Sequence, residues 1–129
     1  MKPEDLRDRT KKVALDVIRF FRSLPKTEEC RIMGRQLIRA ATSVAANYRA
    51  ACRARSHAEF VAKIGVVVEE ADESAFWLEM LRDSKSAPAA AVAPLLNEAN
   101  QLVAIFSASR RTARRSLAIT KSADHQITR

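Results

Sequence analysis

Arginines spaced three or four residues apart are the side chains of this sequence best suited to chemistry. One row, within residues 31–53, is made of Arg31, Arg35, Arg39, Arg49 and Arg53, with Thr42 and Ala46 at the intermediate steps. In an α-helix this spacing places the side chains on one side. Because guanidinium groups bind phosphates and carboxylates through paired hydrogen bonds, the row indicates either a phosphate-binding face or pairing with acidic side chains.

A second basic cluster follows later in the sequence and consists of Arg110, Arg111, Arg114 and Arg115. Such a cluster could neutralise phosphates and release their counterions, or it could compensate the dipole at the C-terminal end of a helix. Aromatic side chains that stack on bases are missing beside both basic groups, apart from Tyr48 next to Arg49. Any binding of RNA or DNA is therefore expected to tolerate many sequences and to weaken steeply with salt.

Acidic residues concentrate in one segment of an otherwise basic chain. The formal net charge is +8, yet residues 56–88 hold seven acidic and three basic residues. Glu69 and Glu73 fall on an otherwise apolar face of this segment, where an unpaired carboxylate is costly. Either the arginines of residues 31–53 pair with them, from the same or a neighbouring chain, or the two residues belong to a solvated acidic face.

No residue pattern supports catalysis or metal binding. Gln36, Ser43 and Asn47 share one side of the second predicted helix, but no histidine lies near them to act as a base. We expect these three side chains to hydrogen-bond the next helix and fix its register. Metal-binding carboxylate bundles use Glu-x-x-His pairs, whereas the carboxylate pairs of this chain lack a histidine. We therefore expect no enzymatic activity, no catalytic residue, no metal site and no cofactor.

The composition favours helices, because the chain has only two glycines and four prolines among 129 residues. Pro25 ends the first helix, Thr27 caps the second, and Ser56 opens the third as part of a capping box with Glu59. Four helices are predicted, at about residues 5–23, 27–54, 56–84 and 90–115.

The predicted helix at 56–84 has two apolar faces rather than one. The first face contains Ile64, Val67, Ala71 and Leu78 and is expected to join the core. The second face lies opposite and consists of Ala62, Val66, Glu69, Glu73, Phe76 and Met80, with Trp77 beside it. An exposed apolar face of this size is unusual in a monomer. It is therefore either a subunit interface or a surface that the first or fourth helix covers within one chain.

Short links between amphipathic helices predict an all-α, antiparallel, up-down-up-down four-helix bundle. We expect residues 1–116 to form this single domain and residues 117–129 to form a polar, disordered tail. The charged N-terminus carries no signal peptide, and no stretch approaches the roughly 20 apolar residues that span a bilayer. Cys30 and Cys52 are read as free thiols of a reducing compartment. We therefore expect a cytoplasmic protein that does not associate with membranes.

Several polar as well as apolar positions resemble one bacterial family. The stretch QLIRAATSVAANYRAA at residues 36–51 is similar to the second-helix signature of the four-helix bundle proteins also called 23S ribosomal RNA intervening-sequence proteins. Residues 56–64, 69–79 and 98–109 resemble later parts of the same family, so the likeness covers roughly residues 12–115. The resemblance implies a four-helix bundle that assembles as a ring-like homopentamer, and it carries over no catalytic residue.

These observations together predict a non-enzymatic, homo-oligomeric binding module from a bacterium. The preferred ligand is RNA or DNA, bound through backbone phosphates by the arginines of residues 31–53 or 110–115. The alternative is a scaffold for protein–protein interaction without a nucleic-acid role, in which the arginines pair with the acidic helix.

Overall fold

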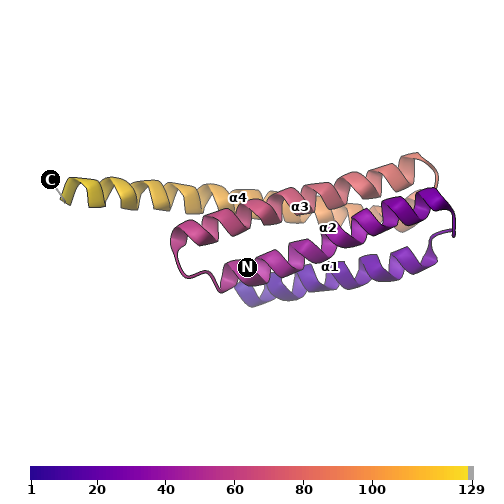
Figure 1. Cartoon of the computed structure of the whole chain (residues 1–129), viewed down its shortest axis with the longest axis horizontal. Helices are drawn as coiled ribbons and strands as arrows, with labels where there is room; N and C mark the ends of the chain where they lie inside the picture. The colour runs from indigo at the N-terminus through magenta and orange to yellow at the C-terminus, as the bar shows by residue number, and fades with distance from the viewer. Residues whose placement is uncertain (128–129) are drawn as a thin grey trace.

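The computed structural model describes residues 1–127 of the chain, with side chains described through residue 122. The described residues form four helices and no strand, which confirms the predicted all-α four-helix fold. Figure 1 shows the four helices running alternately up and down beside one another. Their bounds are α1 Pro3–Ser23, α2 Glu28–Cys52, α3 His57–Asp83 and α4 Ala89–Ile127.

The helix ends follow from the local signals in the sequence. Pro3 occupies the first position of α1, where its missing N–H costs nothing, and α1 ends before Leu24, which precedes a proline. The side chain of Thr27 accepts a hydrogen bond from the backbone N–H of Cys30 at the start of α2. Ser56 likewise caps α3 by accepting from the N–H of Glu59 at 3.0 Å.

Each helix packs on its neighbours in the sequence. The α2–α3 and α3–α4 pairs form the most extensive contacts, α1 packs on α2, and α1 touches α4 more sparsely. The α1–α4 side is held by Arg9, whose Nε and Nη2 atoms donate to both oxygens of Glu98 at 2.7 and 2.6 Å. The short links force this antiparallel order, because each link leaves room only for a reversal of direction.

The core is a continuous apolar cluster to which all four helices contribute. Its completely buried side chains include Val17, Leu37, Ile64, Leu102 and Phe106. The ring of Tyr48 packs on Phe106 with the ring centroids 4.9 Å apart. The core face that the sequence predicts for α3 is therefore present, because the three- and four-residue spacing of its apolar side chains points them all inward.

The fourth helix is longer than the sequence predicts. We expect it to end near residue 115, but α4 continues to Ile127, and Figure 1 shows its last turns extending past the end of the bundle. No proline or glycine interrupts residues 110–127, so nothing in the local sequence stops the helix. The expected disordered tail is thus helical through residue 127, and residues 128–129 lie outside the described part of the chain.

Within residues 1–127, one helix is long and apolar enough to cross a membrane by length and composition alone, namely the stretch Ala89–Ser122 of α4. This stretch differs from the expectation that no part of the chain approaches the apolar length needed to span a bilayer. Core helices of water-soluble bundles meet the same criterion, and Val92, Ala99, Leu102 and Phe106 of α4 are buried in the core. The stretch is therefore weak evidence for a membrane span.

Candidate nucleic-acid and subunit-interaction surfaces

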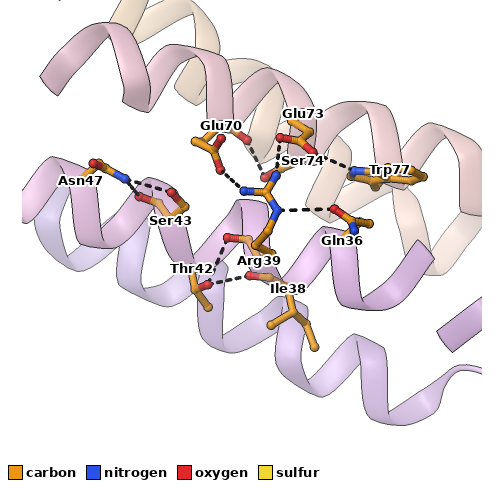
Figure 2. Close-up of polar contacts among 10 residues, drawn as sticks. All are labelled: Gln36, Ile38, Arg39, Thr42, Ser43, Asn47, Glu70, Glu73, Ser74 and Trp77. Atoms are coloured by element: carbon orange, nitrogen blue, oxygen red, sulfur yellow. Dashed lines mark hydrogen bonds and ion pairs between the residues drawn. The ribbon is translucent and has the colours of Figure 1, made fainter. Parts of the chain in front are cut away.

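Arg39 links α2 to α3 near the middle of the bundle. Its side chain reaches between two carboxylates of α3, with Nη1 donating to Glu70 at 3.0 Å and Nη2 donating to Glu73 at 2.5 Å (Figure 2). The indole Nε1 of Trp77 donates to the other oxygen of Glu73 at 3.3 Å. Because α2 and α3 are antiparallel neighbours, a long side chain on one reaches carboxylates on the other within a single chain.

The electrostatics of this link follow from the hydrogen bonds. The Arg39 guanidinium lowers the pKa of Glu73, the Trp77 indole lowers it further, and partial burial opposes both. Hydrogen bonding to Glu73 raises the pKa of Arg39 in turn. Arg39 therefore helps to hold α2 against α3. Glu69, the other acidic residue that the sequence analysis singles out, is exposed and takes no part in the link.

The second apolar face of α3 is uncovered in the single chain. Val66, Phe76 and Met80 are 37%, 48% and 39% exposed, so neither α1 nor α4 covers them. Ala62 is also exposed, while Trp77 is half-buried and packs edge-on against Phe76 with the ring centroids 4.9 Å apart. The Arg39 link and this apolar face therefore meet where Glu73, Phe76 and Trp77 adjoin.

A basic hollow lies where α2 turns into α3. Its volume is about 440 Å³, and its cationic lining consists of Arg49, Arg53, Arg55 and Lys63, with Glu59 as the one acidic residue. Glu59 sits there because one of its oxygens accepts from the backbone N–H of Arg55 at 3.2 Å, as part of the helix start. Its uncharged lining residues are Ala46 and Ala50, so no bulky apolar side chain from the described part of the chain lies among the charged ones.

A second hollow, of about 560 Å³, continues from the first along the α1–α2 boundary. The two hollows share Ala46, Arg49 and Arg53 in their linings. Arg7 and Lys11 add positive charge from α1, where Asp8 is the one acidic lining residue among those that the structure describes. We call the two hollows together, lined by residues of α1, α2 and the start of α3, the basic groove.

The arginine cluster on α4 lies at the same end of the bundle. The ring Nε2 of His57, at the start of α3, is 2.8 Å from the backbone oxygen of Ala113, which fixes this end of α4 beside the α2–α3 link. Arg111, Arg114 and Arg115 are exposed there. Arg110 differs, because its guanidinium group packs against Gly65 of α3 and is only partly accessible.

The structure separates the predicted arginine row into three environments. Arg31 and Arg35 are exposed and line neither hollow, Arg39 is bound to α3, and Arg49 and Arg53 line the basic groove. Four further cations of the groove are not among the predicted site residues, namely Arg7, Lys11, Arg55 and Lys63. The charge surplus of residues 1–55 hints at Arg7, Lys11 and Arg55, whereas Lys63 lies in the acidic segment 56–88. Only helix packing could bring the three segments to one groove.

Gln36, Ser43 and Asn47 do not bond to α3 as expected. Asn47 instead donates to the backbone oxygen and the hydroxyl of Ser43, both at 2.9 Å, and Gln36 accepts from Nε of Arg39 at 3.4 Å. These bonds stay within α2 because residues three and four apart are nearest neighbours on a helix (Figure 2). Within the described residues, no group of three His, Cys, Asp or Glu side chains is placed to hold a metal ion.

Fold and surfaces together define a small all-α bundle protein with a basic groove and an exposed apolar helix face. The family of 23S rRNA-intervening sequence proteins matches residues 5–108, which is most of the chain, and the protein belongs to this family. The matched range contains every groove cation and ends before Arg110.

A solved structure supports the fold. A protein of unknown function from the S23 ribosomal protein family of Bacteroides thetaiotaomicron VPI-5482 superposes with a TM-score of 0.79 and is 24% identical. The match covers 86% of this chain and 99% of that one. A search of curated proteins finds no match. At this identity the neighbour shows a shared fold, and its function is not known.

Proposed function

We propose that this protein is a non-enzymatic, homo-oligomeric module that binds RNA or DNA through backbone phosphates, with little regard to sequence. The observation that carries the proposal is the basic groove, where six cationic residues face two acidic ones. Within the described residues, none of the six forms an ion pair, so their charge is available to a ligand. Unpaired cations in a concave surface attract polyanions and raise their local concentration.

The arginines of α4 support the same function. Arg111, Arg114 and Arg115 are exposed at the groove's end of the bundle, on a helix that extends past the other three. A projecting basic helix can contact phosphates without interference from neighbouring side chains. Because this cluster lies beyond the matched range, we assign it an auxiliary role and the groove the main one.

The exposed apolar face of α3 favours self-association as the second part of the proposal. Val66, Phe76 and Met80 are each more than one third exposed and lie on a single helix face. Covering them with another copy of the chain would remove apolar surface from water. A ring, of five subunits as the family resemblance implies, would repeat the basic groove around the assembly and strengthen binding by multivalency. The same face also supports the alternative function, a scaffold whose partner is another protein.

A salt titration tests the binding. Fluorescence anisotropy with labelled RNA and DNA of mixed sequence should show binding at low salt. The logarithm of the association constant should fall linearly with the logarithm of the salt concentration, with a slope of about 0.7 to 0.9 per phosphate contact. The Arg114→Ala, Arg115→Ala double variant should weaken binding to all sequences alike. Absence of binding to every RNA and DNA at low salt would leave the protein-scaffold function as the better explanation.

A further inference from the structure

We propose that the basic groove is a track for the phosphodiester backbone of one extended nucleic-acid strand, rather than a docking face for a duplex. This inference rests on the proposed function and specifies which form of nucleic acid the site accepts. Three properties of the groove carry it: its continuity across three segments, its charge, and the size and chemistry of its floor.

Continuity comes from the residues that the two hollows share. Arg49, in the last turn of α2, and Arg53, its C-cap residue, line both hollows, so the positive surface does not break between them. Lys11 and Arg7 extend it along α1, while Lys63 extends it onto α3. A polymer with a charge on every repeat can follow such a surface, whereas a single small anion would use only one part of it.

The charge of the groove is suited to phosphates rather than to bases. The six cations are Arg7, Lys11, Arg49, Arg53, Arg55 and Lys63. Among the residues that the structure describes, no Phe, Tyr, Trp or His lines either hollow, so the groove lacks the platforms on which unpaired bases stack. A strand would therefore lie with its phosphates toward the protein and its bases toward solvent, which makes binding tolerant of sequence.

The floor of the groove selects a single strand. On α2 its uncharged lining consists of small side chains, Thr42, Ala45, Ala46 and Ala50, which allow a backbone to approach α2 closely between the flanking cations, while Ala14, Leu15 and Ile18 line the α1 side. Packed helices lie roughly 8–10 Å apart, so a depression between two of them is much narrower than a nucleic-acid duplex. A duplex would touch only the rim, while an extended strand can enter and be contacted from both walls.

The test compares ligands on the full chain by fluorescence anisotropy. The probes are a labelled oligo(dT) and an oligo(U) of about 12 nucleotides, within the usual range of strand site sizes, together with a duplex of equal length. Unlabelled inorganic polyphosphate is the competitor. We expect tighter binding of both strands than of the duplex at equal salt. The proposal would be overturned if the duplex binds more tightly than the strands, or if polyphosphate binds more tightly than both strands.

Three double variants then locate the site. Arg49→Gln with Arg53→Gln should weaken strand binding at least tenfold and lower the salt slope by about 0.7 for each charge removed. Arg22→Gln with Lys26→Gln removes the same charge from exposed positions at the opposite end of the bundle and should change binding less than twofold. Arg49→Lys with Arg53→Lys should retain most of the affinity, which separates loss of charge from loss of fold.

The outcomes distinguish this inference from the function on which it rests. If the unaltered protein binds no nucleic acid, the proposed function fails. If it binds, but the Arg49 and Arg53 variant binds as well as the parent, the track is wrong while the function stands. If that variant instead changes the native mass without changing strand affinity, the groove receives a second copy of the chain, and the track is again overturned. The double variant Arg7→Gln with Lys11→Gln, on the α1 wall of the groove, should show a similar loss of strand affinity.

Discussion

The guanidinium group of Arg110 lies against α3 at Gly65, where a Cβ atom would come within 3.2 Å of Nη2 and 3.3 Å of Nε. The Nε atom is buried and has no hydrogen-bond partner within the described residues. At this α3–α4 contact, Gly65 leaves room for the charged end of the Arg110 side chain. This relationship explains why Arg110 behaves differently from the three exposed arginines that follow it.

We predict that Gly65→Ala stabilises the fold by up to about 1 kcal/mol. Alanine is favoured over glycine inside a helix by about that amount, and Arg110 can move because it is the far end of a flexible side chain. Gly34→Ala is the matched comparison, because its Cβ would meet the buried Leu24 Cδ1 atom at 3.3 Å. Overpacking there should outweigh the helix gain and cost about 1 kcal/mol net. Urea unfolding measures the stability of both variants. A Gly34→Ala protein more stable than the Gly65→Ala protein would contradict this prediction.

The Arg39–Glu73 link should contribute to stability in a pH-dependent way. The pKa of Glu73 is lowered in the folded state, chiefly by the hydrogen bond from Arg39, so the contribution is complete above the unfolded pKa of about 4.5 and is lost as pH falls through the lower, folded pKa. Because about half of the Arg39 side chain is exposed, solvent screening limits the effect of Arg39→Ala to about 0.5–1 kcal/mol at pH 7.

Chemical denaturation at neutral and acidic pH checks this prediction. The stability difference between the parent and Arg39→Ala should be present at pH 7 and should shrink well below pH 4. Arg35→Ala is the control, since Arg35 is exposed and forms no ion pair within the described residues. A difference that is the same at both pH values would show that Arg39 acts through packing of its aliphatic stem instead.

The Arg9–Glu98 pair should matter more than the surface pairs. Its side chains are only 22% and 25% exposed, and the two parallel hydrogen bonds close the sparsely packed α1–α4 side. Arg9→Ala should therefore cost about 1–2 kcal/mol of unfolding free energy, because it leaves a half-buried carboxylate without its partner. Arg9→Lys keeps the charge but loses the two parallel N–H donors of the guanidinium group, and it should cost about half as much unfolding free energy. Equal stability of parent and Arg9→Ala in urea would contradict this role.

Phe76→Glu tests whether α3 is a subunit interface. Burying a charged side chain between two subunits is costly, so the variant should associate less well. We therefore expect smaller particles in light scattering, or insoluble protein. Glu79→Gln is the control, because Glu79 is an exposed residue of the same helix outside the predicted interface. Phe76→Glu protein with full solubility and the parent's mass would reject the interface.

Much of the fold could be predicted from local signals. Pro25, Thr27 and Ser56 set helix boundaries to within a few residues, because capping and the missing proline N–H act on the backbone immediately beside them. The end of α4 was the exception. An arginine cluster suggested a terminus, but positive charge near the end of a helix does not stop it unless a breaker follows.

The candidate surfaces could be predicted only in part. The two apolar faces of α3 follow from three- and four-residue spacing, and the exposure of Phe76 agrees with the second face lying outside the core. Spacing also places Arg39 and Arg49 on one side of α2. Spacing alone does not show that Arg39 binds Glu70 and Glu73 of the same chain while Arg49 lines an open groove.

The sequence alone determined the four helices, their inward apolar faces and the surplus of positive charge, since each depends on interactions between residues a few positions apart. Tertiary structure alone decided which charges remain free. Arg7, Arg49 and Lys63 lie on three separate segments and line one groove only after the helices have packed, and Arg39 is taken up by α3 through the same packing. Charge is fixed by composition, but its availability to a ligand is fixed by which partners the fold brings within reach.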